Sequence, residues 1–188
     1  MNAWIKSPIT AAVAIAMTIV LWPSASQAAD MALSDVHEAI AVVQPTKGHT
    51  AKGVVHFSEM DGKLRITIDL EGLEPNTSHG FHIHQYGDSS AEDGTSTGGH
   101  FAPDGHRHGA PDAVEHHAGD LGNVRSDANG NVHQEMTVDF ITIAGPKNPI
   151  LGRAVILHEG EDDLTSQPTG AAGARIGYGV IGIAKPKD

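Results

Sequence analysis

The sequence predicts an all-β protein in which about eight short antiparallel strands form a sandwich or barrel. Three observations support this prediction. Eight segments carry the apolar and polar alternation, rich in β-branched residues, that is typical of half-buried strands. Helix signals are few. Two stretches dominated by Gly, Asp, Ser and Pro lack an apolar period, and structureless loops of that length are usually functional or disordered.

The strands follow a short acidic leader, and turn signals separate several of them. Asp61-Gly62 predicts a hairpin turn between the second and third strands, and Asn129-Gly130 predicts a turn before the sixth. The first long loop covers residues 87–120, and the second runs from Gly160 to Arg175. There is no internal repeat or second domain. We expect strands at residues 38–43, 51–59, 63–72, 79–87, 119–127, 131–141, 150–159 and 177–185.

Residues 1–28 are predicted to be a signal peptide. Lys6 precedes an apolar run from about Ile9 to Trp22, which is too short for a membrane span. Ser26-Gln27-Ala28 then places small residues at the two positions that a signal peptidase reads, so cleavage is expected after Ala28. We therefore expect an exported protein, periplasmic or secreted, whose residues 29–188 form one domain with no membrane contact after cleavage.

The net charge argues against two classes of binding partner, and the lack of cysteine excludes disulfide bonds and a lipid anchor. The predicted signal segment holds one cation, Lys6, and no acid, so its removal lowers the formal charge from −11 to −12. Nucleic acids and anionic membranes bind basic patches, and so acidic a chain argues against both. The chain has no cysteine, which excludes disulfides and a cysteine-linked lipid anchor. Its stability must have another source.

Histidine is the residue type that suggests a function. In "GFHIHQYGD", His82 and His84 lie on one face of a predicted strand, because side chains alternate between the two faces. An isolated pair of this kind is more often two surface histidines than a chelate. The first long loop adds His100, His108, His117 and Asp120, and "AVILHE" adds His158 near a strand end. Imidazoles suit both zinc and copper, and three histidines with one aspartate satisfy four-coordinate zinc.

The stretch from Gly80 to Asp188 resembles the copper/zinc superoxide dismutases, and residues 38–73 agree more loosely. The motifs that carry the resemblance occur in the family's order: "GFHIHQYGD", "GGHFAPDGHRHGAP", "HHAGDLGNV", "GRAVILHE", "TGAAGAR" and "GVIGIA". The resemblance implies a Greek-key β-barrel that dismutes the superoxide anion to dioxygen and hydrogen peroxide, with copper and zinc as cofactors.

The resemblance also implies a role for each site residue. It assigns copper to His82, His84, His100 and His158, and zinc to His100, His108, His117 and Asp120. His100 would then bridge the two metals and release and take up a proton. Asp162 matches the carboxylate that links a copper histidine to a zinc histidine. Arg175 matches the arginine that docks the anion, and Thr169 matches the threonine at the channel mouth.

The other seven histidines are interpreted as surface or hydrogen-bonded residues. They are His37, His49, His56, His79, His106, His116 and His133. The sequence also departs from the family. Gly94 and Tyr178 occupy the positions of the family's intrasubunit disulfide, and the loop from His158 to Arg175 is short and holds no lysine. Long-range steering of superoxide by that loop is therefore in question.

Two other functions compete with the enzyme. A metal-binding module, such as an exported copper and zinc buffer or a chaperone-like domain, needs ligands but no catalytic arginine, so Arg175 favours the enzyme. A zinc hydrolase needs an open position on zinc, whereas the zinc ligand set here is complete. "GVIGIA", "ILGR" and "QYGD" resemble the segments that form the dimer contact in the eukaryotic branch, which predicts a homodimer.

Overall fold

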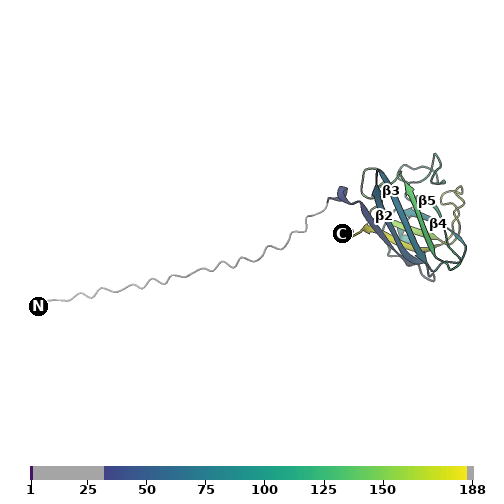
Figure 1. The fold of residues 1–188 in the computed structure, drawn as a ribbon, viewed down its shortest axis with the longest axis horizontal. Helices are drawn as coiled ribbons and strands as arrows, with labels where there is room; N and C mark the ends of the chain where they lie inside the picture. The colour runs from purple at the N-terminus through teal and green to yellow at the C-terminus, as the bar shows by residue number, and fades with distance from the viewer. Residues whose placement is uncertain (2–31, 186–188) are drawn as a thin grey trace. The chain divides into compact units, whose positions relative to one another are not determined.

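Eight strands form the fold in a computed structural model that describes Met1 and residues 32–185. The predicted signal peptide lies outside the described residues. Two short 3₁₀ helices, η1 (Leu33–Asp35) and η2 (Thr95–Thr97), accompany the strands. The strands, several of which are labelled in Figure 1, are β1 (Glu38–Pro45), β2 (Lys52–Met60), β3 (Lys63–Glu71), β4 (Ser78–His84), β5 (Asp120–Arg125), β6 (Val132–Val138), β7 (Ala154–His158) and β8 (Arg175–Ile183).

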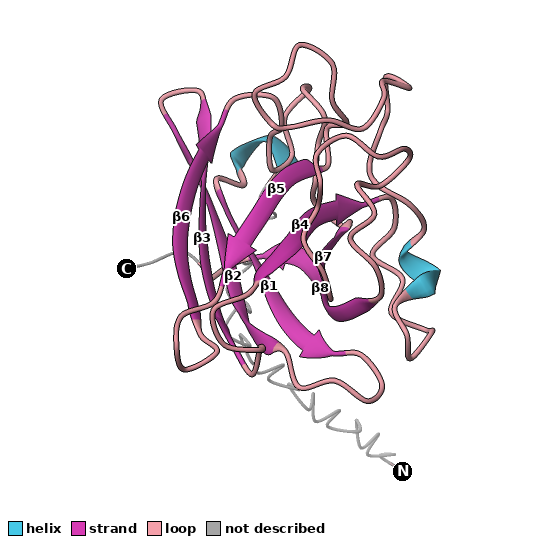
Figure 2. Cartoon of the chain, turned by 90° about the vertical axis from the view of Figure 1, so that its right-hand side faces the viewer, coloured by secondary structure: helices cyan, strands magenta, loops and turns pink. Residues whose placement is uncertain are grey.

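The strand order is that of a Greek key. All neighbouring strands are antiparallel, in the order β5-β4-β7-β8-β1-β2-β3-β6. β3 lies beside β6 and β4 lies beside β7, so two long connections cross the barrel instead of joining neighbours. The edge strands β5 and β6 approach each other, and Gln134 Nε2 donates to the Asn123 carbonyl oxygen at 3.4 Å. The nearly closed barrel, visible in Figure 2, confirms the predicted all-β Greek-key fold.

Alternating residues along the strands build the core. On β3, Leu64, Ile66, Ile68 and Leu70 are buried, while the residues between them face outward. β4 differs because all its residues from His79 to His84 are buried. Its second face is covered by the two long loops, and this is the face that carries the histidines.

The chain between β6 and β7 departs from the prediction. We expected strands to reach Ile141 and to resume at Ile150, but β6 ends at Val138 and β7 begins at Ala154. The apolar alternation there was misleading because Ile141, Ile143 and Ile150 are buried against the core without pairing as a ladder. Residues 139–153 instead form a third long connection, with only an isolated bridge between Thr142 and Pro149.

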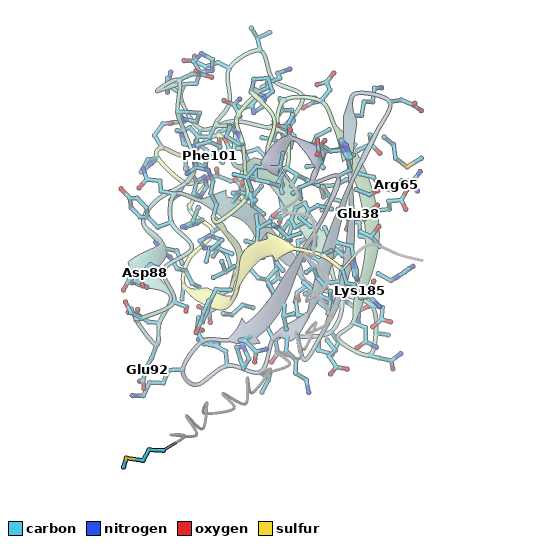
Figure 3. The ribbon with its side chains drawn as sticks, turned by 90° about the vertical axis from the view of Figure 1, so that its left-hand side faces the viewer. Glu38, Arg65, Asp88, Glu92, Phe101 and Lys185 are labelled. Atoms are coloured by element: carbon cyan, nitrogen blue, oxygen red, sulfur yellow. The ribbon has the colours of Figure 1, made fainter. Side chains whose placement is uncertain are left out.

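The two predicted loops lie on the same side of the barrel. Residues 85–119 join β4 to β5, and residues 159–174 join β7 to β8, on the right-hand side and top of Figure 2. Figure 3 labels Phe101, Asp88 and Glu92 along this side, opposite Arg65 on β3. The loops therefore meet over the strands that carry His82, His84 and His158.

Candidate metal centre

The first cluster consists of four buried histidines, three of which lie on strands. His82 and His84 project from the same face of β4, His158 ends the adjacent β7, and His100 comes from the long loop. One ring nitrogen from each lies within 4.8 Å of the others. An isolated bridge between His84 and His100 holds the loop against the strand.

The ring nitrogens that face the centre of this cluster have no hydrogen-bond partner among the described residues. They are His82 Nδ1, His84 Nε2, His100 Nε2 and His158 Nε2. The opposite nitrogens of His84 and His158 lie 2.9 and 3.1 Å from the carbonyl oxygens of Gly98 and Gly173. An orphaned buried imidazole nitrogen is costly. Four that converge on one point fit a metal ion whose ligands are oriented by outer hydrogen bonds.

The second cluster contains His100, His108, His117 and Asp120, and its members come from the long loop and the start of β5. Asp120 Oδ1 lies 2.8, 3.0 and 3.3 Å from the Nδ1 atoms of His100, His108 and His117. The Nδ1 atoms of His100 and His117 are 3.4 Å apart. Ligands of a tetrahedral zinc ion with bonds of 2.0–2.1 Å would be about 3.3 Å apart. The donor set and its spacing therefore fit zinc.

His100 belongs to both clusters, through different atoms. Its Nδ1 contacts Asp120 in the second cluster, and its Nε2 is one of the orphaned nitrogens of the first. The rings of His82 and His100 have centroids 4.0 Å apart. A single imidazole thus lies between two metal-binding centres.

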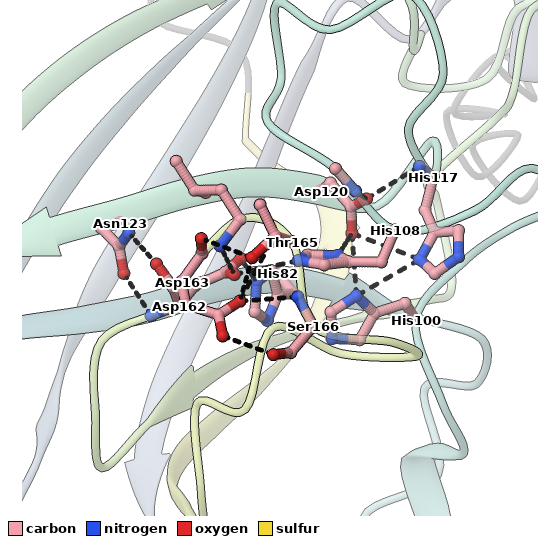
Figure 4. Close-up of polar contacts among 12 residues, drawn as sticks. His82, His100, His108, His117, Asp120, Asn123, Asp162, Asp163, Thr165 and Ser166 are labelled. Carbon is pink, nitrogen blue, oxygen red and sulfur yellow. Dashed lines mark hydrogen bonds and ion pairs between the residues drawn. The ribbon is translucent and has the colours of Figure 1, made fainter.

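Asp162 connects the two clusters by a second route. Its Oδ2 lies 2.7 Å from His82 Nε2, and its Oδ1 lies 2.9 Å from His108 Nε2 (Figure 4). Burial acts to raise the pKa of Asp162, but hydrogen bonds with His82, the Leu164 amide and His108 outweigh it and lower that pKa. Gly170 packs directly on this contact, because a Cβ there would lie 1.7 Å from Asp162 Oδ1.

Burial keeps three histidines of the first cluster, His84, His100 and His158, in the form that binds metals. Burial, reinforced by neighbouring histidines, lowers the pKa of His84 to about 2 and that of His158 to about 3. Burial also lowers the pKa of His100 to about 4, against the opposing hydrogen bond with Asp120. These rings are neutral at pH 7, so each has a lone pair for a cation.

The second cluster has a carboxylate that stays ionised. Burial acts to raise the pKa of Asp120, but hydrogen bonds with the His100 and His117 rings and from the amides of His117 and Gly109 hold it well below its usual range. Burial also acts to lower the pKa of His108, but the charges of Asp120 and Asp162 outweigh it and raise that pKa. The second cluster therefore contains an ionised carboxylate, which the first cluster lacks.

Arg175 begins β8 beside the first cluster. Its Nη1 donates to the carbonyl oxygen of Gly94 and to Thr97 Oγ1, and its Nη2 donates to the carbonyl oxygen of Gly98. Arg175 also borders an open cavity of about 320 Å³. Lys47 lines the same cavity, but its Nζ lies 2.7 Å from Glu92 Oε2, which offsets its charge. Thr169 is half-buried in the second loop, next to Gly170.

The histidines outside the clusters are surface or hydrogen-bonded. His37, His106 and His133 are exposed, and His49, His56 and His116 are half-buried. His79 is buried, with its ring nitrogens 2.7 Å from Thr77 Oγ1 and 2.9 Å from the His158 carbonyl oxygen. His117 lies in the second cluster, whereas Nδ1 of its neighbour His116 donates to the His117 carbonyl oxygen.

Three residues that support the site were not predicted. Asn123 on β5 holds Asp162 by two bonds, one with its backbone amide and one with its carbonyl oxygen. Gln167 forms a similar pair of bonds with the backbone of His108. Thr97 contacts Arg175. Only Asn123 carried a signal, because asparagine is uncommon within strands.

Comparisons with known proteins agree with this geometry. The family model described as copper/zinc superoxide dismutase matches residues 51–181. A superoxide dismutase [Cu-Zn] of Schizosaccharomyces pombe is 45% identical over 140 residues, covering 70% of this chain and 90% of the relative. One from Neurospora crassa is 40% identical and covers 79% of this chain and 99% of the relative. A crystal structure of the clock protein EA4 matches with a TM-score of 0.71 and 42% identity, covering 79% of this chain and 95% of that one.

Proposed function

Because the chain belongs to the copper/zinc superoxide dismutase family, we propose how its two clusters divide the family's chemistry. Its reaction is the dismutation of two superoxide anions and two protons to dioxygen and hydrogen peroxide, and its cofactors are copper and zinc. Copper belongs in the cluster of His82, His84, His100 and His158. Zinc belongs in the cluster of His100, His108, His117 and Asp120.

The observation that carries this division is the shared imidazole of His100, which offers Nε2 to the four-histidine cluster and Nδ1 to the cluster that contains Asp120. Copper, when bound, supplies the one-electron transfers to and from superoxide. Four imidazole ligands suit a metal that changes oxidation state. A closed His₃Asp set suits zinc, which has no redox chemistry of its own.

The protein's own residues bind the anion and supply a proton. Arg175 holds superoxide through the guanidinium donors that its bonds to the long loop leave free, because a fixed fork of N–H groups suits a small anion. His100 holds a proton at Nε2 in one half of the cycle and gives it up in the other. We assign Thr169 to the channel mouth on its match to the family's threonine, next to Gly170 in the second loop. Asp162 orients His82 and His108 together.

An assay of superoxide dismutation tests the proposal. Wild-type protein loaded with copper and zinc should be active, and Arg175→Ala should lower kcat/KM by about one to two orders of magnitude, as expected for the loss of a charged hydrogen bond of about 1.5–3 kcal/mol. Metal content should be unchanged. Full activity of the fully loaded variant would contradict the role of Arg175, whereas an inactive, fully loaded wild type would favour the alternative function, a copper and zinc buffer without catalysis.

Export through residues 1–28 is part of the proposal. Among the described residues, no helix has the length and apolar character to cross a membrane. The family match begins at residue 51, so the predicted signal peptide precedes it. N-terminal sequencing of protein recovered from the periplasm or medium should begin at Ala29. Full-length chain found only in the cytoplasm would contradict export.

A homodimer is also proposed, through a face on β1 and β8. Val42 and Val180 are 52% and 39% exposed there. Single exposed apolar residues are common on protein surfaces, whereas a cluster of them indicates an interface. Gly87 joins this face, because a Cβ on it would lie 2.3 Å from the Gly152 carbonyl oxygen and 2.9 Å from Val180 Cγ1. Solution scattering should report a dimer, and Val180→Asp should give a monomer. A monomeric wild type at every accessible concentration would contradict this proposal.

A further inference from the structure

We propose that Thr97 is a positioning residue that fixes the guanidinium of Arg175 for anion binding. Thr97 ends η2 in the long loop, and its side chain is fully buried. The inference rests on the docking role of Arg175 proposed above. Nothing in the sequence motifs or the resemblance assigned Thr97 a role.

Two of the three hydrogen-bond contacts of the Thr97 hydroxyl join it to Gly94 and Arg175, and their directions are consistent. The hydroxyl donates to the Gly94 carbonyl oxygen at 2.8 Å and accepts from Arg175 Nη1 at 3.1 Å. Arg175 Nη1 also donates to that same carbonyl oxygen of Gly94. The three groups form a closed triangle in which the hydroxyl's donor and acceptor capacity are both used.

This arrangement decides which donors of Arg175 remain for a ligand. A guanidinium has five N–H groups, and the bonds to Gly94, Thr97 and Gly98 use both on Nη1 and one on Nη2. Within the described residues, no hydrogen bond uses the Nε–H or the second N–H of Nη2. These two remain for an anion, and Thr97 fixes the opposite corner of the group.

The same carbonyl that receives Arg175 also orients a copper ligand. The Gly98 oxygen accepts from Arg175 Nη2 at 2.7 Å and lies 2.9 Å from His84 Nδ1. Thr97 Oγ1 lies 3.4 Å from that nitrogen. Thr97 and the adjacent Gly98 thus set the position of the anion-binding group relative to the metal ligand.

Azide binding to the copper- and zinc-loaded protein, followed by the visible Cu(II) spectrum, tests the role. Thr97→Val preserves shape but removes the acceptor, so azide should bind about fivefold more weakly, the equivalent of one hydrogen bond of about 1 kcal/mol. Thr97→Ser keeps the hydroxyl and should restore affinity. kcat/KM for superoxide should follow the same order, with metal content unchanged.

Thr46→Val is the matched control. Thr46 is also a buried threonine bonded to Arg175, but its Oγ1 donates to the backbone carbonyl oxygen at 2.7 Å and does not contact the guanidinium. Thr46→Val should lower Tm as Thr97→Val does, yet leave azide affinity at the wild-type value. If Thr97→Val proves unstable, Thr97→Ala provides the same comparison with Thr97→Ser.

The outcomes distinguish a failure of the role of Thr97 from a failure of the docking role of Arg175. Wild-type azide affinity in Thr97→Val, with weakened affinity in Arg175→Ala, would overturn the role of Thr97 alone. Equal weakening in Thr97→Val and Thr46→Val would also overturn it, because a general loss of packing would then explain both. Equal azide affinity in wild type and Arg175→Ala would overturn the docking role of Arg175 and the inference with it.

Discussion

The two metal clusters share one histidine but are built from different parts of the chain. In the cluster proposed for copper, His82, His84 and His158 lie on adjacent strands of the barrel. In the cluster proposed for zinc, every histidine comes from the loop at residues 85–119, and Asp120 begins the next strand. The first is positioned by strand ladders, whereas the second forms only when the loop closes on itself.

This difference indicates distinct roles for the metals. The barrel can hold the three strand histidines without assistance, so zinc should affect copper binding mainly through His100, the one ligand that comes from the loop. The loop has no disulfide, because the chain has no cysteine. Zinc binds only the folded loop and should therefore stabilise it by mass action. Because His100 and Arg175 both depend on that loop, zinc supports catalysis indirectly.

The largest expected effect is on the strand-built cluster. His84→Ala should reduce dismutation to background, because copper loses a ligand while the zinc set remains complete. Metal analysis should show lost copper and retained zinc. His133→Ala, which changes an exposed histidine on β6, is the control and should be fully active. Retained activity in His84→Ala would remove His84 from the copper site.

The loop-built cluster should respond in the opposite way. Asp120→Asn should weaken zinc binding by more than about 100-fold. Asp120 is proposed to bind zinc directly, and its loss should cost more affinity than the loss of a residue that only orients a ligand. Copper retention should fall much less. Competition with a chelator, followed for each metal separately, measures both. The same pattern of loss in Asp120→Asn and His84→Ala would contradict the division between the clusters.

Acidic pH should weaken the metal-free fold before the ordinary carboxylates titrate. Burial holds the folded-state pKa values of His84, His100 and His158 below the ordinary histidine value of 6.5. Below pH 6.5 the unfolded chain binds more protons at these sites than the folded chain does, so the histidines' contribution to stability is lost as pH falls toward about 4. The free energy of unfolding should fall by about 1.4 kcal/mol per pH unit for each histidine. Denaturant melts of apo protein at pH 7, 5.5 and 4.5 measure this loss. A flat profile would contradict the neutral, buried state of the rings.

The smallest effect should come from a restored cross-link. Gly94→Cys with Tyr178→Cys closes a long chain loop, for which the entropy model suggests roughly 4–5 kcal/mol. Gly94 has a φ of 74°, so a cysteine there is strained and the gain falls by about 1 kcal/mol. Pro45, Lys47, Glu92 and Tyr178 line one cavity, which places Tyr178 beside this loop.

The cross-link also distinguishes the two states of the loop. The gain in Tm should be larger in apo protein than in zinc-loaded protein, where the metal already restrains the loop. Gly94→Cys alone measures the backbone strain and is the control. A reductant should change the Tm of the double variant only. An equal gain in both states would show that zinc does not hold this loop.

Much of the site could be anticipated because its ligands are residue types with specific chemistry. Strand alternation places His82 and His84 on one face and the long loop adds His108 and His117, but the resemblance to the family is what assigns each of them as a ligand. Residues whose partners are backbone atoms left no comparable signal. Thr97 bonds a carbonyl three residues away and a side chain 78 residues away, and only the folded loop brings these together.

The strands were predictable for a similar reason. The prediction failed where apolar side chains pack on the core but their backbone does not pair with a neighbouring strand. Strands with alternating burial, such as β3, can be recognised in the sequence because one of their faces is exposed to solvent and carries polar residues. Ile141, Ile143 and Ile150 carry the same apolar signal but are buried by the Greek-key connection, without a ladder. Periodicity reports burial, and it cannot distinguish a strand from a loop that packs on the core.

Anomalous diffraction from crystals of the copper- and zinc-loaded protein, recorded at both absorption edges, tests the division of metals most directly. The copper signal should lie among His82, His84, His100 and His158, and the zinc signal among His100, His108, His117 and Asp120. The imidazole of His100 should separate the two peaks. Zinc at the four-histidine cluster with copper at the aspartate cluster, or a single metal centre away from His100, would contradict the account.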